Sequence, residues 1–136
     1  MVRQLHEAAR AIPGVERAGL STWNPLDRGS FGASLEAEDH RLEPGQSGII
    51  VNHRQVTPEW FETAGVALLR GRTFTAADAA GAQPVAIVSR RLAERLWPGE
   101  DALGKRLRQA RPENPWITVV GVVGDVRDYG EWPETW

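Results

Sequence analysis

The apolar segments of this chain are short, and proline or glycine interrupts the sequence between them. The longest strongly apolar run, "ITVVGVVG" at residues 117–124, has eight residues, whereas a helix that spans a bilayer needs about 18. Pro13 and Gly14 end one helical pattern, and Pro98 and Gly99 end another. We therefore expect short elements joined by turns, with no transmembrane helix and no secretory leader at the start of the sequence.

Two helices are expected in the first half of the chain. Residues 2–12 carry apolar side chains at helical spacing, which predicts a short amphipathic helix. The second pattern covers residues 58–65, where Thr57 is the expected N-cap and Pro58 occupies the first helical position. Gly65 is expected to end this helix.

A third helix is predicted at residues 90–97, with Ser89 as its N-cap. Thr75 and Asp78 have the spacing of a capping box, which predicts a short helical turn. The third helix has one apolar stripe facing the core, and its arginines face water. The stripe consists of Leu92, Ala93, Leu96 and Trp97.

Seven segments have the alternation or the compact apolar character of strands. They are residues 15–23, 31–38, 49–56, 66–74, 83–89, 104–109 and 115–128. We expect residues 31–38 to be half-buried and residues 49–56 to be mostly buried. Mixed element order with short connections favours an α+β fold, in which two or three short helices pack on one face of a mixed, mostly antiparallel sheet.

Composition is that of an ordinary globular domain. Apolar residues make up 41% and charged residues 25% of the 136 residues, which excludes a disordered or fibrous chain and fits one domain over residues 1–136. A net charge of −2 gives no overall attraction to nucleic acid. Cysteine is absent, so disulfides, thiolate metal sites and cysteine catalysis are excluded.

One segment imitates a phosphate-binding loop. Gly99, four residues, then Gly104 and Lys105 match most of the pattern G-x-x-x-x-G-K-[ST]. A true phosphate loop follows a strand and ends in a hydroxyl, whereas Gly99 follows a predicted helix and Arg106 stands in the hydroxyl position. We predict a connection from a helix to a strand, with Lys105 beginning an exposed strand.

No arrangement of histidines supports a catalytic or metal site. His6, His40 and His53 lack metal-ligand spacing, and we expect solvated or singly hydrogen-bonded side chains. A triad of Ser89, His53 and Asp78 is conceivable, but Ser89 lacks the G-x-S-x-G context and its capping role explains it. We therefore predict no enzyme activity, no cofactor and no metal.

The carboxylates do not indicate an acid–base catalytic site, and the glycines do not indicate a dinucleotide-binding site. Glu36 and Glu38 share one strand face and lack an apolar surrounding, so we expect exposed, solubilising charge. The sequence "GVVGD" at residues 121–125 lacks the third glycine of a dinucleotide-binding turn, and we interpret it as a flexible strand or a bulge.

The six tryptophans are the unusual feature of the composition. Trp60 and Trp97 fall on predicted helices and Trp116 on a strand, where core packing accounts for them. Trp132 and Trp136 lie in a polar tail, and exposed tryptophan is typical of an interface. We expect them to contact the remainder of a longer protein or a separate partner.

The second half of the chain contains an ordered series of motifs. They are V-T-P-x-W-F-x-x-x-G at 56–65, a leucine followed by G-R-x-F at 69–74, an acidic turn at Asp78, P-V-A-I-V at 84–88, L-W-P-G at 96–99, G-x-x-x-x-G-K at 99–105 and V-V-G-V-V-x-D-V at 119–126. This series resembles the MacB-like periplasmic core domain of permeases in the MacB and FtsX-like ABC transporter superfamily. Position 60 is tryptophan where tyrosine is commoner in that family, and the opening "IPGVERAGLSTWNPL" is also similar to it.

The resemblance implies a noncatalytic domain outside the cytoplasmic membrane, on its periplasmic face, that transmits conformational change between membrane helices and the outside. Implied partners are the transmembrane helices of the same permease, a periplasmic adaptor or lipoprotein cargo, a cytoplasmic ATPase subunit and a second permease copy. The abrupt ends of the sequence agree with a fragment of a larger permease. An alternative is a sensor domain for a small anion or lipid, in which Arg70 and Arg72 hold the anion.

Overall fold

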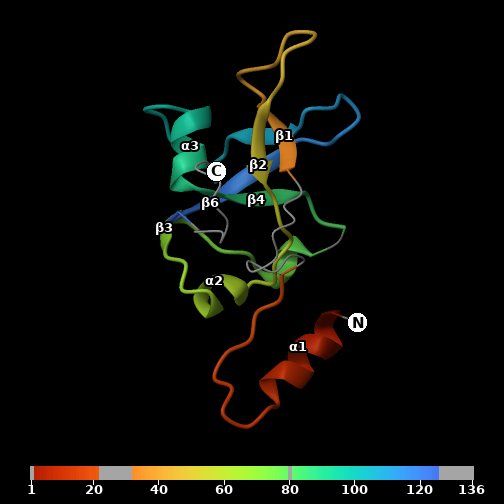
Figure 1. The fold of residues 1–136 in the computed structure, drawn as a ribbon, viewed down its shortest axis with the longest axis vertical. Coiled ribbons are helices and arrows are strands. Elements are labelled where there is room, and N and C mark those ends of the chain that lie inside the picture. Colours follow the sequence, from red (N-terminus) through yellow and green to blue (C-terminus); the bar gives the residue numbers. More distant parts are fainter. Residues whose placement is uncertain (1, 22–31, 80, 126–136) are drawn as a thin grey trace.

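The computed structural model describes residues 2–21, 32–79 and 81–125. Its centre is a six-stranded sheet with the order β2-β1-β5-β6-β3, in which β4 pairs with the free flank of β6 (Figure 1). The β4–β6 pair is parallel and the other pairs are antiparallel, which confirms the predicted α+β class. The strands are β1 Gly32–Ala37, β2 Ile49–Asn52, β3 Leu68–Gly71, β4 Val85–Ser89, β5 Arg106–Gln109 and β6 Ile117–Val123.

Strand β6 holds the sheet together because it is bonded along both flanks. β4 runs along one flank, while β5 and then β3 share the other. The β3–β6 contact requires two glycines: a Cβ on Gly71 would lie 2.2 Å from the carbonyl oxygen of Val120, and one on Gly121 would lie 2.3 Å from that of Arg72. The β4–β6 register shifts at Gly121, so the bulge expected in this segment is present.

The main core lies between the sheet and α3 Arg90–Leu96. Ser89 caps this helix as predicted, since its hydroxyl accepts a hydrogen bond from the Leu92 amide at 3.2 Å. Trp97 follows the helix and is 1% exposed. The whole predicted stripe is buried, together with β-strand side chains that include Leu35, Val51, Val88, Leu107, Val119 and Val122.

A second, smaller core lies on the opposite face of the sheet. It is formed around Trp60 and Phe61 of α2 Trp60–Thr63, with Val123 of β6. Neighbouring strand residues point to opposite faces, and Val122 belongs to the main core whereas Val123 belongs to the smaller one. The expectation that all helices share one face is therefore wrong, because α3 packs on one face of the sheet and α2 on the other (Figure 1).

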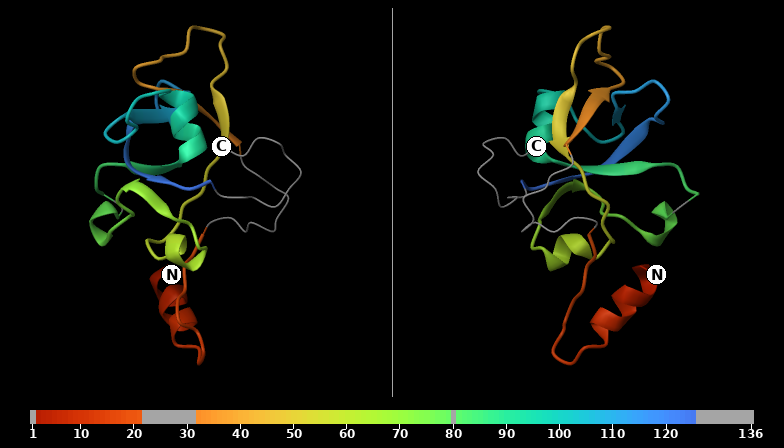
Figure 2. Two further views of the ribbon diagram at one scale, coloured as in Figure 1. Left: turned by 90° about the vertical axis from the view of Figure 1, so that its left-hand side faces the viewer. Right: turned by 45° about the vertical axis from the view of Figure 1, so that its right-hand side comes forward.

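The first helix stands apart from the sheet. α1 Val2–Arg10 confirms the predicted helix, and Figure 2 shows it beyond α2, at the end of an extended segment. Leu5 on α1 does not pack on the core, since it is 55% exposed, and Ile12, two residues beyond the helix, is 57% exposed. The predicted strand at 15–23 is wrong within the described residues: Ser21 forms an isolated bridge with Val56, and residues 15–20 form no strand.

Two local predictions near α2 and β2 are also wrong. Thr57 does not cap α2; Glu59 holds the N-cap position, and the Thr57 hydroxyl instead accepts a hydrogen bond from Leu20. Strand β2 is buried on one face only: Val51 belongs to the main core, whereas its neighbour Ile50 points to the other face and is 56% exposed rather than buried. The capping box of Thr75 and Asp78 is present and begins the 3-10 turn η1 Ala76–Asp78.

Within residues 2–21, 32–79 and 81–125, no helix has the length and apolar character needed to cross a membrane.

Candidate functional site

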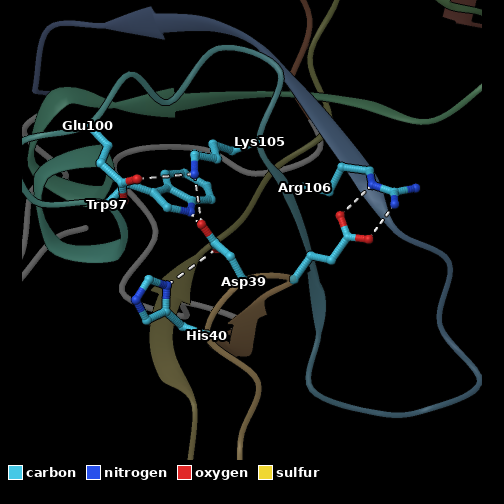
Figure 3. A network of polar contacts seen from close by, with 7 residues as sticks. Asp39, His40, Trp97, Glu100, Lys105 and Arg106 are labelled. Atoms are coloured by element: carbon cyan, nitrogen blue, oxygen red, sulfur yellow. Dashed lines mark hydrogen bonds and ion pairs between the residues drawn. The ribbon is translucent and has the colours of Figure 1, made fainter.

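A polar cluster joins three segments that are far apart in the sequence. The Asp39 carboxylate, just after β1, accepts a hydrogen bond from the Trp97 indole at 2.9 Å and one from the Lys105 ammonium at 2.8 Å (Figure 3). Lys105 also lies 3.4 Å from Glu100, and His40 Nδ1 lies 3.3 Å from Asp39. We call Asp39, Trp97 and Lys105 the Asp39 clamp, because they fix the end of α3 and the start of β5 against β1.

The charges of the Asp39 clamp reinforce one another. The hydrogen bond from Lys105 is the main cause that lowers the pKa of Asp39 well below its usual range, against the opposing effect of burial, and Trp97 and His40 add to it. Reciprocally, the hydrogen bond to Asp39 raises the pKa of Lys105. The ionised carboxylate is thus the form that the folded protein stabilises.

The clamp explains the imitation of a phosphate loop. Gly99 and Gly104 adopt φ of +74° and +82°, which only glycine adopts readily, so both serve to reverse the chain. The segment connects α3 to β5, as predicted, but the strand begins at Arg106 and lies between β1 and β6, so the expected exposed strand from Lys105 is wrong. Lys105 is 30% exposed and directs its ammonium to the carboxylates of Asp39 and Glu100. The lysine that suggested phosphate binding is therefore occupied by an internal partner.

Two glutamate–arginine pairs cross from β1 to β5. Glu38 binds Arg106 through both of its carboxylate oxygens at a partly exposed position (Figure 3). Glu36 binds Arg108 at 2.6 Å, and both side chains are 7% exposed. Exposed, solubilising charge was expected for Glu36, and this is wrong: directly opposite Arg108 in the β1–β5 register, it is buried with its counter-charge.

The ring of Trp116 covers the buried Glu36–Arg108 pair. Trp116 is half-buried just before β6, and the Arg108 guanidinium lies 4.2 Å from its ring centroid. Core packing was expected for Trp116, whereas it covers the ion pair instead. Burial opposes ionisation of Glu36, but the Arg108 hydrogen bond, the Leu42 amide and nearby cationic charge outweigh it and lower the pKa of Glu36.

The proposed anion-binding arginines are each engaged by a carboxylate. Arg70 Nη2 lies 2.8 Å from Asp101 Oδ2. Arg72 binds Asp78 through two hydrogen bonds of 2.7 and 3.0 Å. The hydrogen bond from Arg72 is the main cause that lowers the pKa of Asp78. An anion at either arginine would have to compete with these carboxylates.

The remaining candidate residues are not gathered into one site. His6 lies on α1, and its Nε2 is 2.8 Å from the carbonyl oxygen of Ala18, as expected of a singly bonded histidine. Among the described residues, no group of three histidines and carboxylates is placed to hold a metal ion. Trp132 and Trp136, predicted to mark an interface, lie outside the described residues.

Asp39 was missed by the sequence analysis. Its partners Trp97 and Lys105 are 58 and 66 residues away in the sequence, so no local spacing indicates the contact. The only available signal was a carboxylate in the acidic run "EAED" after a predicted strand.

Comparison with known structures identifies the class of this fold. The periplasmic region of MacB from Actinobacillus actinomycetemcomitans has a TM-score of 0.66 at 18% identity, over 90% of this chain and 50% of that one. The extracellular domain of the noncanonic ABC-type transporter YknZ from Gram-positive bacteria gives 0.62 at 16% identity, over 90% and 56%. A domain of a putative permease protein from Porphyromonas gingivalis gives 0.60 at 26% identity, over 89% and 44%.

The fold is thus that of extracytoplasmic domains of ABC-type transporters. The family model of the MacB-like periplasmic core domain matches residues 2–132, and the chain belongs to this family of permease domains. A search among curated proteins gives no match. The chain spans about half the length of the solved structures that it resembles, 44% to 56%.

Proposed function

We propose that the chain is a noncatalytic domain on the outer face of the membrane that transmits conformational change of a permease and contacts an adaptor or cargo. Such a role requires a body that moves as a unit. The observation that carries the proposal is the cross-bracing by the Asp39 clamp and the buried Glu36–Arg108 pair, which tie α3, β1 and β5 together. Membership in the permease-domain family supports it.

We further propose that residues 1–136 are one domain of a longer permease and that its own membrane helices are its first partner. Leu5 on α1 and Ile12, just beyond its end, are exposed apolar side chains that the sheet does not cover, and such side chains are suited to contact another part of the assembly. A cytoplasmic ATPase subunit, a second permease copy and a periplasmic adaptor or lipoprotein cargo complete the proposed set of partners.

The test breaks the clamp in the intact permease that carries this domain. Asp39→Asn removes the charge that binds Lys105 while keeping the shape of the side chain. We expect ATP hydrolysis to persist while ATP-dependent export falls, because force is no longer passed through a rigid body. Glu94→Gln, at an exposed position on α3, is the matched control and should leave both activities unchanged. Unaltered export in Asp39→Asn would refute the proposal.

The anion or lipid sensor makes a different prediction. If Arg70 and Arg72 held a ligand, titration of the chain with phosphate or with anionic lipid vesicles would give a saturable change in tryptophan fluorescence that Arg70→Ala abolishes. We expect no saturable change, because both guanidinium groups already bind carboxylates. A saturable response that disappears in Arg70→Ala would favour the sensor.

A further inference from the structure

The extended segment after α1 is fastened to the start of α2 by reciprocal hydrogen bonds. The Leu20 amide donates to the Thr57 hydroxyl at 2.9 Å, and the Thr57 amide donates to the Leu20 carbonyl at 2.9 Å. Ser21 and Val56 form an antiparallel bridge beside them. Thr57 thus binds both the backbone amide and the backbone carbonyl of Leu20, although the two residues are 37 positions apart in the sequence.

A close backbone approach strengthens this contact. A Cβ built on Gly19 would lie 2.5 Å from Cα and 2.8 Å from N of Trp60, both of which are main-chain atoms. The absence of a side chain at Gly19 therefore lets the segment lie directly on the backbone of α2. Backbone atoms cannot rotate away as a side chain can. A displacement of the segment at Gly19 is therefore passed to the backbone at Trp60.

A side chain of helix α1, that of His6, also contacts the region where the extended segment meets α2. His6 Nε2 is 2.8 Å from the Ala18 carbonyl oxygen and 3.6 Å from a carboxylate oxygen of Glu59, the N-cap residue of α2. The His6 side chain is 15% exposed, whereas Leu5 beside it is 55% exposed. α1 is thus held to the domain through His6, while Leu5 remains exposed.

From α2 the contacts continue into the sheet. Trp60 and Phe61 meet at 5.3 Å between ring centroids, and both are buried against Val123 of β6. β6 is bonded to three other strands and also lines the main core. A continuous set of packed groups therefore runs from α1 through α2 to the centre of the sheet, as coupling between distant parts requires.

We propose that Gly19 and Leu20, docked on Thr57 and Trp60, form the joint through which displacement of α1 reaches the sheet. This inference rests on the proposed function and assigns a specific contact to it. Thr57 is the positioning residue of the joint: its side chain does not cap α2 but ties the incoming chain to it.

The joint is tested by measuring the position of α1 against the body. The chain has no cysteine, so Gln4→Cys on α1 and Glu94→Cys on α3, both exposed positions, accept a pair of spin labels. Thr57→Val keeps the size of the side chain and loses the hydroxyl, while Thr57→Ser keeps the hydroxyl. We expect the label-to-label distance distribution to broaden and move to longer distance in Thr57→Val and to match the parent protein in Thr57→Ser.

A second label pair separates loss of the joint from loss of the fold. Glu94→Cys and Gln109→Cys both lie in the sheet-and-α3 body at exposed positions, and their distance should be the same with either residue at position 57. An unchanged α1 distribution in Thr57→Val would overturn the joint, and so would broadening of both label pairs. Gly19→Ala should displace α1 in the same way, because its Cβ meets the Trp60 backbone.

Failure of the proposed joint can be distinguished from failure of the proposed function. If Thr57→Val releases α1 in the labelled chain but export by the intact permease is unchanged, the joint stands and the transmission role fails. If Thr57→Val leaves α1 in place while Asp39→Asn uncouples export, the role stands and the joint is wrong.

Discussion

Helices α3 and α1 have similar apolar patterns in the sequence but differ in how far the structure buries them. Both helices have an apolar stripe in the sequence, yet the α3 stripe is buried and ends in Trp97 at 1% exposure, whereas Leu5 on α1 is 55% exposed. The body adds the Asp39 clamp and a buried ion pair, while α1 is held through His6 and the joint on α2. Amphipathic spacing therefore predicts a helix with an apolar stripe, but it does not indicate whether the same domain buries that stripe.

The largest expected effect tests this difference in burial. Trp97→Ala should lower the free energy of unfolding by about 3–5 kcal/mol, because it empties a filled core position and leaves Asp39 without its indole donor. Leu5→Ala should lower it by less than about 0.5 kcal/mol, because the side chain is already half in water. Urea unfolding of both variants provides the measurement.

Similar losses in these two variants would contradict the comparison. That result would mean that α1 is packed on the body of the domain in solution, and the two regions would then form one cooperative unit with a shared core.

The buried ion pair should give the next largest effect. Glu36→Ala leaves the Arg108 guanidinium buried without its counter-charge, and we expect a loss of about 3 kcal/mol in the free energy of unfolding. Replacing both residues, Glu36→Leu with Arg108→Met, removes the charges together and should return stability to within about 1 kcal/mol of the parent protein. Chemical denaturation measures both, and a double variant no better than Glu36→Ala would show that the pair itself is required.

A smaller effect than that of the buried ion pair is expected at Asp39, and it depends on pH. Asp39→Asn should cost about 1 kcal/mol at pH 7, the low end for charged hydrogen bonds, because the Asp39 side chain is 35% exposed and partly screened. The pKa of Asp39 is lower in the folded than in the unfolded protein, so ionisation stabilises the fold above the unfolded value of about 4.

This stabilisation is lost as pH falls toward the folded pKa, so the difference between parent and Asp39→Asn should shrink between pH of about 5 and about 2. Thermal unfolding across that range checks the sign. Glu94→Gln serves as the control for a carboxylate on the surface of α3. A difference that grows on acidification would show that the carboxylate is not held in its ionised form.

Local patterns were sufficient where the interaction itself is local. The Ser89 cap, the Thr75–Asp78 capping box and the turns at Gly99 and Gly104 are contacts between near neighbours in the sequence, and each is present. The family motifs, spread from residue 56 to residue 126, likewise indicated the correct family.

Predictions failed where a residue interacts with a segment that is distant in the sequence. Thr57 has the local context of an N-cap, but Leu20 takes its hydroxyl. Glu36 has the context of a solvated carboxylate, but β1–β5 pairing places it opposite Arg108. In both cases the partner lies far away in the chain, and its position depends on sheet register rather than on neighbouring residues.

Residue order alone established most of the short elements, the Ser89 cap, the Thr75–Asp78 capping box, the glycine turns, the α+β class and the family, since each follows from spacing within a few residues or from an ordered set of motifs. Folding in three dimensions decided that α2 and α3 lie on opposite faces of β6, that Lys105 binds Asp39, and that α1 remains uncovered. These outcomes depend on which distant surfaces meet. The free energy of such contacts comes from shared burial and paired charge, neither of which any single segment contains.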